Sequence, residues 1–491
     1  MEPSVAGPRE SSSYEPVIGL EIHVQLNTRS KLFCGCAAQF GAPPNTNVCP
    51  VCLGLPGALP VVNASAVELA VQTALAVGCE VHARSAFARK NYFYPDLPKG
   101  YQISQYDRPL ATDGVVELPA EGGSGVMRIR IRRLHVEEDS GKSLHDRFTG
   151  RTAIDLNRAG VPLIEIVTEP DFSAASQARA FLDRLKKMLQ YLGVSDCNME
   201  EGSLRVDANV SVRPAGSGEL STKTEVKNMN SFSQLEKALR FEASRHVAVL
   251  ASGGLVEHQT VLWDSTRGEA WPMRGKEEVH DYRYFPEPDL PILELGDGTL
   301  ARAADALPEM PQEKVSRLVS EYGLPTYDAE VLSSTCEMAD YFEAVARLTR
   351  NPKLASNWVM VEVLAVANER GSSVAEVGLP PDRLAELIAI VAAGDLSHGL
   401  ARQVLSRMVD TGKGAEEVME AEGLRQVSDI SQLESWVAEI FAENPVEVDR
   451  YRGGDGRLLA FFIGQVMRKS KGKADPDRLI KMLEKSLGSG L

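Results

Sequence analysis

Four cysteines near the start of the chain have the type and spacing of metal ligands. They form C-x-C followed, after twelve residues, by C-x-x-C. Two such pairs joined by a loop can bring four thiolates into the tetrahedral geometry that zinc takes in structural sites. We therefore expect structural zinc on Cys34, Cys36, Cys49 and Cys52. The alternatives are four ordinary cysteines in a loop or two disulfides, and a reducing compartment disfavours disulfides.

A second set of candidate ligands lies on a predicted strand. Apolar and polar residues alternate over 15–27, which predicts a β-strand with Glu21 and His23 on its polar face. A carboxylate and an imidazole two residues apart point the same way and can hold one divalent cation. The alternative is an exposed strand face, on which the same residue types are common.

Two further strands add charge to this predicted face. Residues 203–213 present Arg205 and Asp207 opposite apolar residues, and residues 162–167 hold Glu165 in the middle of an apolar strand. A buried carboxylate is costly unless a cation or a metal pairs with it. Glu165 therefore favours a metal-dependent site over a solvated sheet face.

The segment 127–139 is a fourth candidate strand, with basic residues opposite apolar ones. Its alternation slips near Leu134, which predicts a β-bulge. The pattern therefore leaves open whether Glu137 or Glu138 faces the other polar residues. Acids, an imidazole and bases together on an antiparallel sheet would suit phosphoryl transfer, in which a metal and cations stabilise the developing charge.

Two loops concentrate aromatic residues in a chain with only 6% of them. Residues 90–107 combine aromatics with Lys90, Asp96 and Lys99, and residues 281–291 form a similar run. Such loops can hold a nucleotide by stacking and by cation–π contact. An ordinary packed loop is the alternative for both.

The elements that must position these residues fill a chain of 491 residues, long enough for two to four domains. The strand patterns and the helices predicted at 174–192 and 234–250 precede a long helical part, so we expect an α+β protein. Its first domain is built on an antiparallel sheet with helices, and a helical domain and a small helical tail domain follow. The expected boundaries are 1–14 for a disordered tail, 15–294 for the sheet domain with the cysteine knuckle, 295–410 for the helical domain and 411–491 for the tail domain.

Composition indicates an ordinary soluble protein, with 43% hydrophobic and 25% charged residues. The net charge of -15 argues against a general nucleic-acid binder. No apolar run reaches the length of a membrane span, and the N-terminus lacks the pattern of a signal peptide, so we expect a cytoplasmic protein. The sequence also lacks a phosphate-binding P-loop, a dinucleotide fingerprint and a nucleophile elbow.

One basic segment stands out near the C-terminal end of this acidic chain. Arg468, Lys469, Lys471 and Lys473 lie close together at the end of a predicted helix. They can contact the phosphates of a nucleic acid. The alternative is a helix end decorated with cations, which the helix dipole favours.

Seven stretches of the chain resemble, in order and spacing, the B subunit of aspartyl/glutamyl-tRNA amidotransferase. They are VIGLEIHVQLN, KNYFYPDLPKGYQISQ, LHVEEDSGKS, DLNRAGVPLIEIVTEPD, MEEGSLRVDANVSVR, EVKNMNSF and DYRYFPEPDLP. The resemblance covers about 15–491 and is weaker toward the end. It implies a subunit that binds Glu-tRNA or Asp-tRNA mischarged on a Gln or Asn tRNA. With ATP and Mg²⁺ such a subunit phosphorylates the side-chain carboxylate, and ammonia from an amidase-type A subunit then gives the amide. A small C subunit completes the heterotrimer.

The resemblance also implies roles for particular residues. Glu21, His23, Glu138 and Glu165 match the magnesium and activation site, so that Glu138 is preferred to Glu137. Lys99 and Arg158 are expected to contact phosphate or carboxylate, and the basic tail is expected to bind tRNA. The four cysteines match a zinc knuckle that some members have. A tRNA-binding scaffold without catalysis and a small-molecule hydrolase or kinase are the competing hypotheses.

Overall fold

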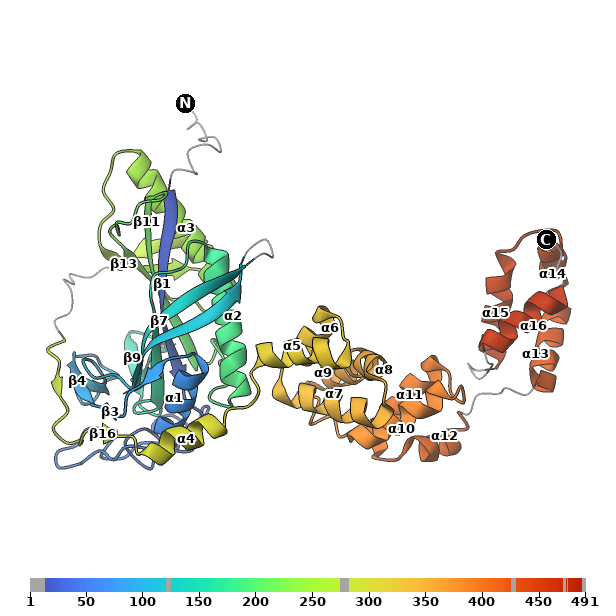
Figure 1. Cartoon of the computed structure of the whole chain (residues 1–491), viewed down its shortest axis with the longest axis horizontal. Coiled ribbons are helices and arrows are strands. Elements are labelled where there is room, and N and C mark those ends of the chain that lie inside the picture. Colours follow the sequence, from blue (N-terminus) through green and yellow to red (C-terminus); the bar gives the residue numbers. More distant parts are fainter. Residues whose placement is uncertain are drawn as a thin grey trace. The chain divides into compact units, whose positions relative to one another are not determined.

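The computed structural model describes residues 14–120, 125–273, 282–424, 430–470, 474 and 476–487. The chain divides into two compact units, Met1–Met310 and Pro311–Leu491, and each is considered by itself. The first unit contains an antiparallel-dominated sheet with helices, and the second is helical (Figure 1). The predicted α+β class is confirmed.

A nine-stranded sheet forms the framework of the first unit. Each strand runs antiparallel to its neighbours except β12 and β13, which pair in parallel. The order across the sheet is β14 (Glu269–Pro272), β13 (Gln259–Asp264), β12 (Thr224–Lys227), β11 (Leu204–Pro214), β1 (Tyr14–Gln25), β10 (Pro162–Thr168), β7 (Val126–Glu138), β6 (Ala111–Pro119) and β2 (Glu80–Val81).

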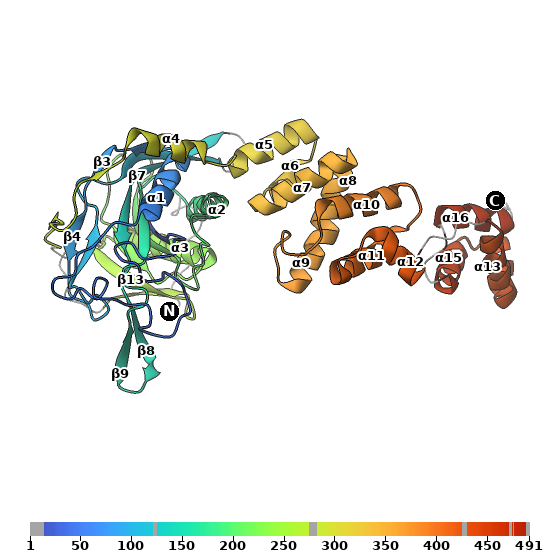
Figure 2. The same cartoon turned by 90° about the horizontal axis from the view of Figure 1, so that it is seen from below.

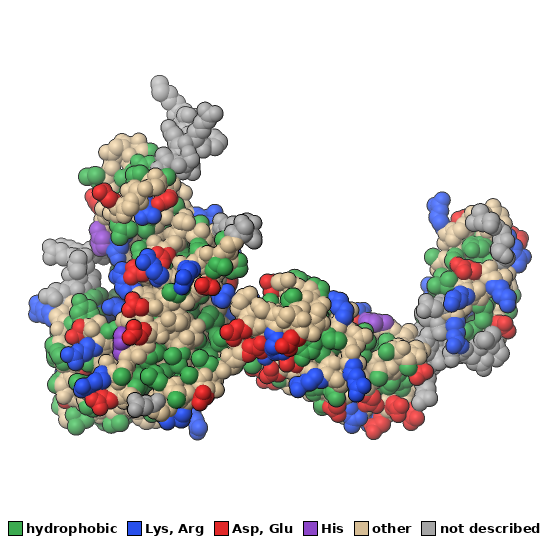
Figure 3. All heavy atoms as spheres, in the orientation of Figure 1, with side chains coloured by type: hydrophobic (Ala, Val, Ile, Leu, Met, Phe, Trp, Pro, Cys, Tyr) green, Lys and Arg blue, Asp and Glu red, His purple; other side chains and the backbone are tan. Residues whose placement is uncertain are grey.

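The two faces of this sheet differ in chemistry because its strands alternate apolar and polar side chains. On one face, residues such as Ile22, Ile164 and Val206 are buried in a core with three helices. These helices are α1 (Ala64–Ala76), α2 (Ala175–Tyr191) and α3 (Phe232–Ala251). The opposite face of the central strands carries charged side chains, and acidic and basic groups intermingle on the side of this unit visible in Figure 3.

The bulge predicted near Leu134 is confirmed, and it resets the phase of β7. The pairing of β7 with β10 passes from Val167 opposite Arg133 directly to Thr168 opposite Ile131, so Arg132 is the extra residue. Ile131 lies in the core before the bulge, and Leu134 and Val136 lie in it afterwards. The odd-numbered residues that follow the bulge therefore project from the polar face.

Smaller elements border the large sheet. The sheet β15-β4-β5 joins β15 (Phe285–Pro286), β4 (Ala88–Asn91) and β5 (Tyr101–Ser104), and β16 (Leu293–Glu294) pairs with β3 (Arg84–Ser85). The hairpin of β8 (Lys142–Phe148) and β9 (Arg151–Asp155) projects from the first unit in Figure 2. Helix α4 (Asp297–Asp305), which follows the boundary expected at 294, packs on α1 within this unit.

The described helices of the second unit surround two hydrophobic cores. The first core runs from Leu318 to Leu424 and the second from Leu433 to Leu487. Helix α12, which follows the boundary expected at 410, contributes Val418 and Met419 to the first core. That core is built from α5 (Pro311–Tyr322), α6 (Thr326–Leu332), α7 (Cys336–Thr349), α8 (Pro352–Asn357), the π-helix η2 (Trp358–Val363), α9 (Leu364–Arg370), α10 (Pro381–Ala392), α11 (His398–Thr411) and α12 (Ala415–Glu422). The second is built from α13 (Ile430–Glu443), α14 (Pro445–Arg452), α15 (Leu458–Lys469) and α16 (Pro476–Leu487).

None of the helices in the described ranges has the length and apolar character needed to cross a membrane.

Packing of α2 on the sheet should dominate the stability of the first unit. Phe181 is fully buried and meets Phe172 edge to face, with ring centroids 5.4 Å apart. We expect Phe181→Ala to lower the free energy of unfolding by about 3–5 kcal/mol, because it removes a large buried ring and leaves a cavity. Urea titration followed by the infrared band of β-sheet measures this. Phe93→Ala, at a ring 94% exposed, is the control and should change the midpoint little.

Candidate active site

Three side chains from adjacent strands converge on the polar face of the sheet. His23 of β1 lies opposite Glu165 of β10, and Glu137 of β7 lies opposite the residue two before Glu165. The Nε2 atom of His23 is 3.5 Å from Glu137 Oε1 and 3.6 Å from Glu165 Oε2. One ligand atom from each residue lies within 4.8 Å of the others, so the set could hold a metal ion. We call His23, Glu137 and Glu165 the metal triad.

A second imidazole supports the carboxylates of the metal triad. His135 Nε2 lies 3.2 Å from Glu165 Oε2 and 3.7 Å from Glu137 Oε2. Burial alone would lower the pKa of His135, but the charge of Glu165, joined by that of Glu137, raises it to about 9. Burial likewise opposes ionisation of Glu165, yet His135 and His23 hold the pKa of this carboxyl well below its usual range. Glu165 is therefore a carboxylate at neutral pH, the form that ligates a hard cation such as Mg²⁺.

Glu138, adjacent to Glu137 on β7, points to the opposite face. Its Oε1 accepts hydrogen bonds from Lys99 Nζ and, at 2.9 Å, from the N–H of Ile103. The predicted phosphate ligand Lys99 is thus ion-paired with a predicted metal ligand. Both line a pocket beside the cysteines, together with Phe33, Cys52, Tyr101 and Gly160.

Glu21 shares the polar face with the metal triad but lies outside it. Its Oε1 accepts a 3.0 Å hydrogen bond from Asn209 Nδ2 of β11. Of the four residues predicted for the magnesium site, the structure therefore brings two together, His23 and Glu165. It adds Glu137 to them and places Glu21 and Glu138 elsewhere.

Asp139 lies immediately after β7, and several polar side chains contact its carboxylate. It is buried, and its carboxylate accepts hydrogen bonds from Arg205 Nη2 at 2.9 Å and Gln25 Nε2 at 2.8 Å. Arg158, predicted to contact phosphate, lies 3.5 Å from the same carboxylate and donates to the carbonyls of Ser140 and Gly141. Burial opposes the charge of Asp139, but the arginines outweigh it, Arg205 more than Arg158, and lower its pKa.

The four cysteines form the second cluster able to hold a metal among the described residues. Their sulfurs lie within 4.8 Å of one another, with Cys49 Sγ 3.9 Å from Cys52 Sγ. A hydrogen bond from Cys34 is the main cause that lowers the pKa of Cys52 to about 4, and nearby Lys31 acts in the same direction. The four-thiol donor set fits a structural metal such as zinc, as the spacing predicted.

The cysteine knuckle is tied to the loop that carries Arg158. The fully buried Lys31 donates to Asn47 O at 2.7 Å and to Leu156 O at 3.4 Å, and its Nζ lies 3.6 Å from Cys52 Sγ. The N–H of Asn47 donates to Asn157 Oδ1 at 2.8 Å. The knuckle therefore supports one wall of the candidate site without touching the metal triad.

Sequence reasoning did not identify His135 and Asp139, and it left Glu137 open. The apolar residues Leu134 and Val136 were the available signal for His135 and Glu137, because they place these two residues on the opposite face. Asp139 follows the strand, where alternation no longer applies.

The predicted basic patch of the tail is only partly described. Arg468 is exposed on α15, whereas Lys469 Nζ lies 2.7 Å from Glu439 and 2.9 Å from Glu443 on α13. Lys471 and Lys473 lie outside the described residues.

Known proteins resemble this chain over almost its whole length. Residues 16–301 match the model of the GatB/GatE catalytic domain, and residues 340–487 match that of the GatB domain. The B subunit of aspartyl/glutamyl-tRNA(Asn/Gln) amidotransferase from Prosthecochloris aestuarii is 50% identical over 479 residues, which cover 98% of this chain and 99% of that protein. The B subunit of the same name from Thermodesulfovibrio yellowstonii is 49% identical over 474 residues, covering 96% and 99%.

The first match contains the large sheet and the metal triad, so the first unit is a catalytic domain of the GatB/GatE class. The sequence identity to these B subunits extends over both units and therefore establishes the family of the whole chain. The chain belongs to the family of aspartyl/glutamyl-tRNA amidotransferase B subunits. The resemblance noted in the sequence is confirmed.

Replacing each of two neighbouring carboxylates with the amide, in separate variants, tests which residue of β7 binds the metal. We expect Glu137→Gln to weaken Mn²⁺ binding at least about tenfold, because it removes an anionic ligand. Glu138→Gln should leave the Mn²⁺ affinity unchanged, since this carboxylate faces Lys99. Electron paramagnetic resonance of free Mn²⁺ measures both. Loss of Mn²⁺ only in Glu138→Gln would return the ligand role to the residue that the resemblance implies.

The cysteine knuckle predicts a measurable metal content. The purified chain should carry about one zinc per molecule, and Cys49→Ser should reduce this sharply because one thiolate ligand is lost. Cys336→Ser, at an isolated cysteine of the second unit, is the matched control. Elemental analysis by mass spectrometry provides the measurement. Equal zinc contents in both variants would exclude the knuckle as the site.

Proposed function

We propose that this chain is the tRNA-dependent activating subunit of an aspartyl/glutamyl-tRNA amidotransferase. It binds Glu-tRNA(Gln), Asp-tRNA(Asn) or both, and phosphorylates the side-chain carboxylate with ATP and Mg²⁺. It then amidates the product with ammonia from a glutamine-hydrolysing A subunit, in a heterotrimer with a small C subunit. The metal triad carries this proposal, because two buried carboxylates and an imidazole on adjacent strands offer a site for the metal that ATP chemistry requires.

The chemistry divides into two displacements. An oxygen of the substrate carboxylate attacks the γ-phosphorus of ATP, the bond to the bridging oxygen breaks, and ADP leaves. Ammonia then attacks the carbonyl carbon of the acyl phosphate, and after loss of a proton inorganic phosphate leaves. Activation is needed because a free carboxylate is a poor acyl donor and phosphate is a good leaving group.

The residues of this chain hold the participants of the first step. A bound Mg²⁺ would neutralise phosphate charge, with His23, Glu137 and Glu165 as its protein ligands. His135 keeps the two carboxylates in place, since it contacts both. Asp139 orients Arg205 and Arg158 toward the same region.

Glu21, Glu138 and Lys99 belong to the proposed activation site in different positions. Glu21 lies on the same face as the metal triad and would add negative charge near a bound cation. Glu138 and Lys99 form a charged pair on the opposite face, in the pocket next to the cysteine knuckle. This pocket adjoins Glu137 through the backbone of β7.

The second unit is the proposed tRNA-binding part, with the basic segment at Arg468, Lys469, Lys471 and Lys473 as a phosphate contact. The described part of this segment supports the proposal through the exposed Arg468. Misacylated tRNA arises where translation takes place, so we infer a cytoplasmic location.

Glu165→Gln tests the activation step. In the complex with its A and C subunits, the variant should lose tRNA-dependent ATP hydrolysis by at least about 100-fold, because an anionic metal ligand becomes neutral. Binding of mischarged Glu-tRNA should survive. Glu169→Gln is the control, since Glu169 pairs with the exposed Arg132 outside the metal triad. A wild-type complex that binds the tRNA without stimulated ATP hydrolysis would instead establish a scaffold.

A further inference from the structure

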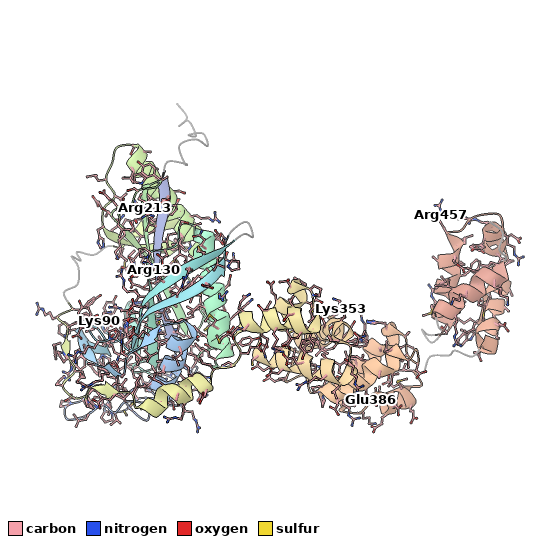
Figure 4. The ribbon with its side chains drawn as sticks, in the orientation of Figure 1. Lys90, Arg130, Arg213, Lys353, Glu386 and Arg457 are labelled. Carbon is pink, nitrogen blue, oxygen red and sulfur yellow. The ribbon has the colours of Figure 1, made fainter. Side chains whose placement is uncertain are left out.

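The polar face of the sheet pairs its cations with its acids almost throughout. On β7, Arg128 pairs with Glu117, Arg130 with Asp171 and Arg132 with Glu169. On β11 and β12, Arg205 pairs with Asp139, Arg213 with Glu15 and Lys227 with Asp207. Figure 4 labels Arg130 and Arg213 among these. An ion pair within the protein is therefore the rule for a cation on these strands.

Arg133 departs from this rule. Among the described residues it has no ion-pair partner, and its buried Nε lacks a hydrogen-bond acceptor. A buried guanidinium nitrogen without an acceptor is costly, so a group that brings an acceptor to this nitrogen would be favoured there. The bulge at Arg132 explains the difference, because it places Arg133 opposite Val167, on the sheet face that carries the metal triad, whereas Arg132 pairs with Glu169.

Arg133 lies one row of the sheet from the metal triad. Cross-strand pairing sets Arg205, His23, Glu165 and His135 in one row, and Asp207, Glu21, Val167 and Arg133 in the next. Two residues of a strand span about 7 Å, which is the reach of a phosphoryl group that has one oxygen on a metal and another on a guanidinium. Val167, short and apolar, leaves the space between Glu21 and Arg133 free of a competing charge.

Lys90, next to this sheet, also has no ion-pair partner among the described residues. It comes from β4, next to the large sheet in Figure 4, and its Nζ lies 4.7 Å from the centre of the Tyr282 ring. Burial opposes its charge, but Glu137 and Glu165 outweigh this and raise the pKa of Lys90. Glu137 and Glu165 therefore act on Lys90 by their charge, and Lys90 and Arg133 both act on the phenol of Tyr284.

We infer that Arg133, with Lys90, binds the phosphoryl group that is transferred from ATP to the substrate carboxylate. This inference rests on the proposed function, to which it adds the residues that recognise the terminal phosphate. A guanidinium can donate two parallel hydrogen bonds to phosphate, which an ammonium cannot. Arg133 is thus the residue that distinguishes ATP from ADP, and Lys90 adds charge.

Substitution of two adjacent arginines tests this inference in the complex with the A and C subunits. Arg133→Gln should lower kcat/KM for ATP in tRNA-dependent hydrolysis by about 100-fold, the scale seen when one donor to a developing charge is lost. Mn²⁺ affinity should stay as in the wild type, because Arg133 is not a ligand. Arg133→Lys should recover part of the loss. Arg132→Gln, which removes only an exposed ion pair, is the matched control and should behave as wild type.

Direct binding separates this inference from the proposed function. Equilibrium dialysis with ATPγS and with ADP, each with Mn²⁺, should show that Arg133→Gln loses about tenfold more affinity for the triphosphate than for the diphosphate. This measurement needs no turnover, so it stands even if the wild-type complex hydrolyses no ATP and the proposed function fails. An unchanged ratio of the two affinities, in a variant with wild-type Mn²⁺ binding, would overturn the role of Arg133.

Discussion

The central constraint of this molecule is the burial of carboxylates side by side on one sheet face. Glu137 and Glu165 are almost entirely removed from solvent, and like charges at such separations repel strongly in a medium of low polarisability. His23 and His135 offset part of this repulsion, since each lies between the two carboxylates. The remaining attraction for positive charge is what would let the metal triad hold a cation, and the nine-stranded sheet supplies the rigidity that keeps the carboxylates together.

The bulge in β7 decides which side chains enter this arrangement. If Arg132 were paired regularly instead of being bulged, alternation from Ile131 would continue through it. Arg133, His135 and Glu137 would then be buried, and Leu134, Val136 and Glu138 would face outward. The bulged pairing of Arg132 thus puts a guanidinium, an imidazole and a carboxylate on the polar face in place of Leu134, Val136 and Glu138. Bulges beside functional sites commonly re-aim side chains in this way.

Alternation along single strands made much of the fold and part of the site predictable from the sequence. It identified β1, β10 and β11, it placed Glu21 and His23 together on one polar face, and it singled out Glu165 because this residue interrupts an apolar strand. Strand order and register are long-range properties, so the pairing of His23 with Glu165 could not be read from either strand alone. Glu137 and Glu138 were inseparable for a related reason, because the position of a bulge depends on the partner strand. The cysteines were easier, since their ligand geometry is set by spacing within one loop.

Residues brought in from outside the strands were beyond such reasoning. Lys90, on which the charges of Glu137 and Glu165 act, comes from a small separate sheet, and no periodicity links 88–91 to 162–168.

Charge accounting connects these features into one site. A divalent cation on the metal triad would balance its two carboxylates, with His135 as an additional positive charge. Asp139 pairs with both Arg205 and Arg158, so its single negative charge offsets one of these two positive charges. Arg133 and Lys90 have no ion-pair partner among the described residues, so they add positive charge to the site. A terminal phosphate carries about two negative charges near neutral pH, and its binding would offset much of this positive charge.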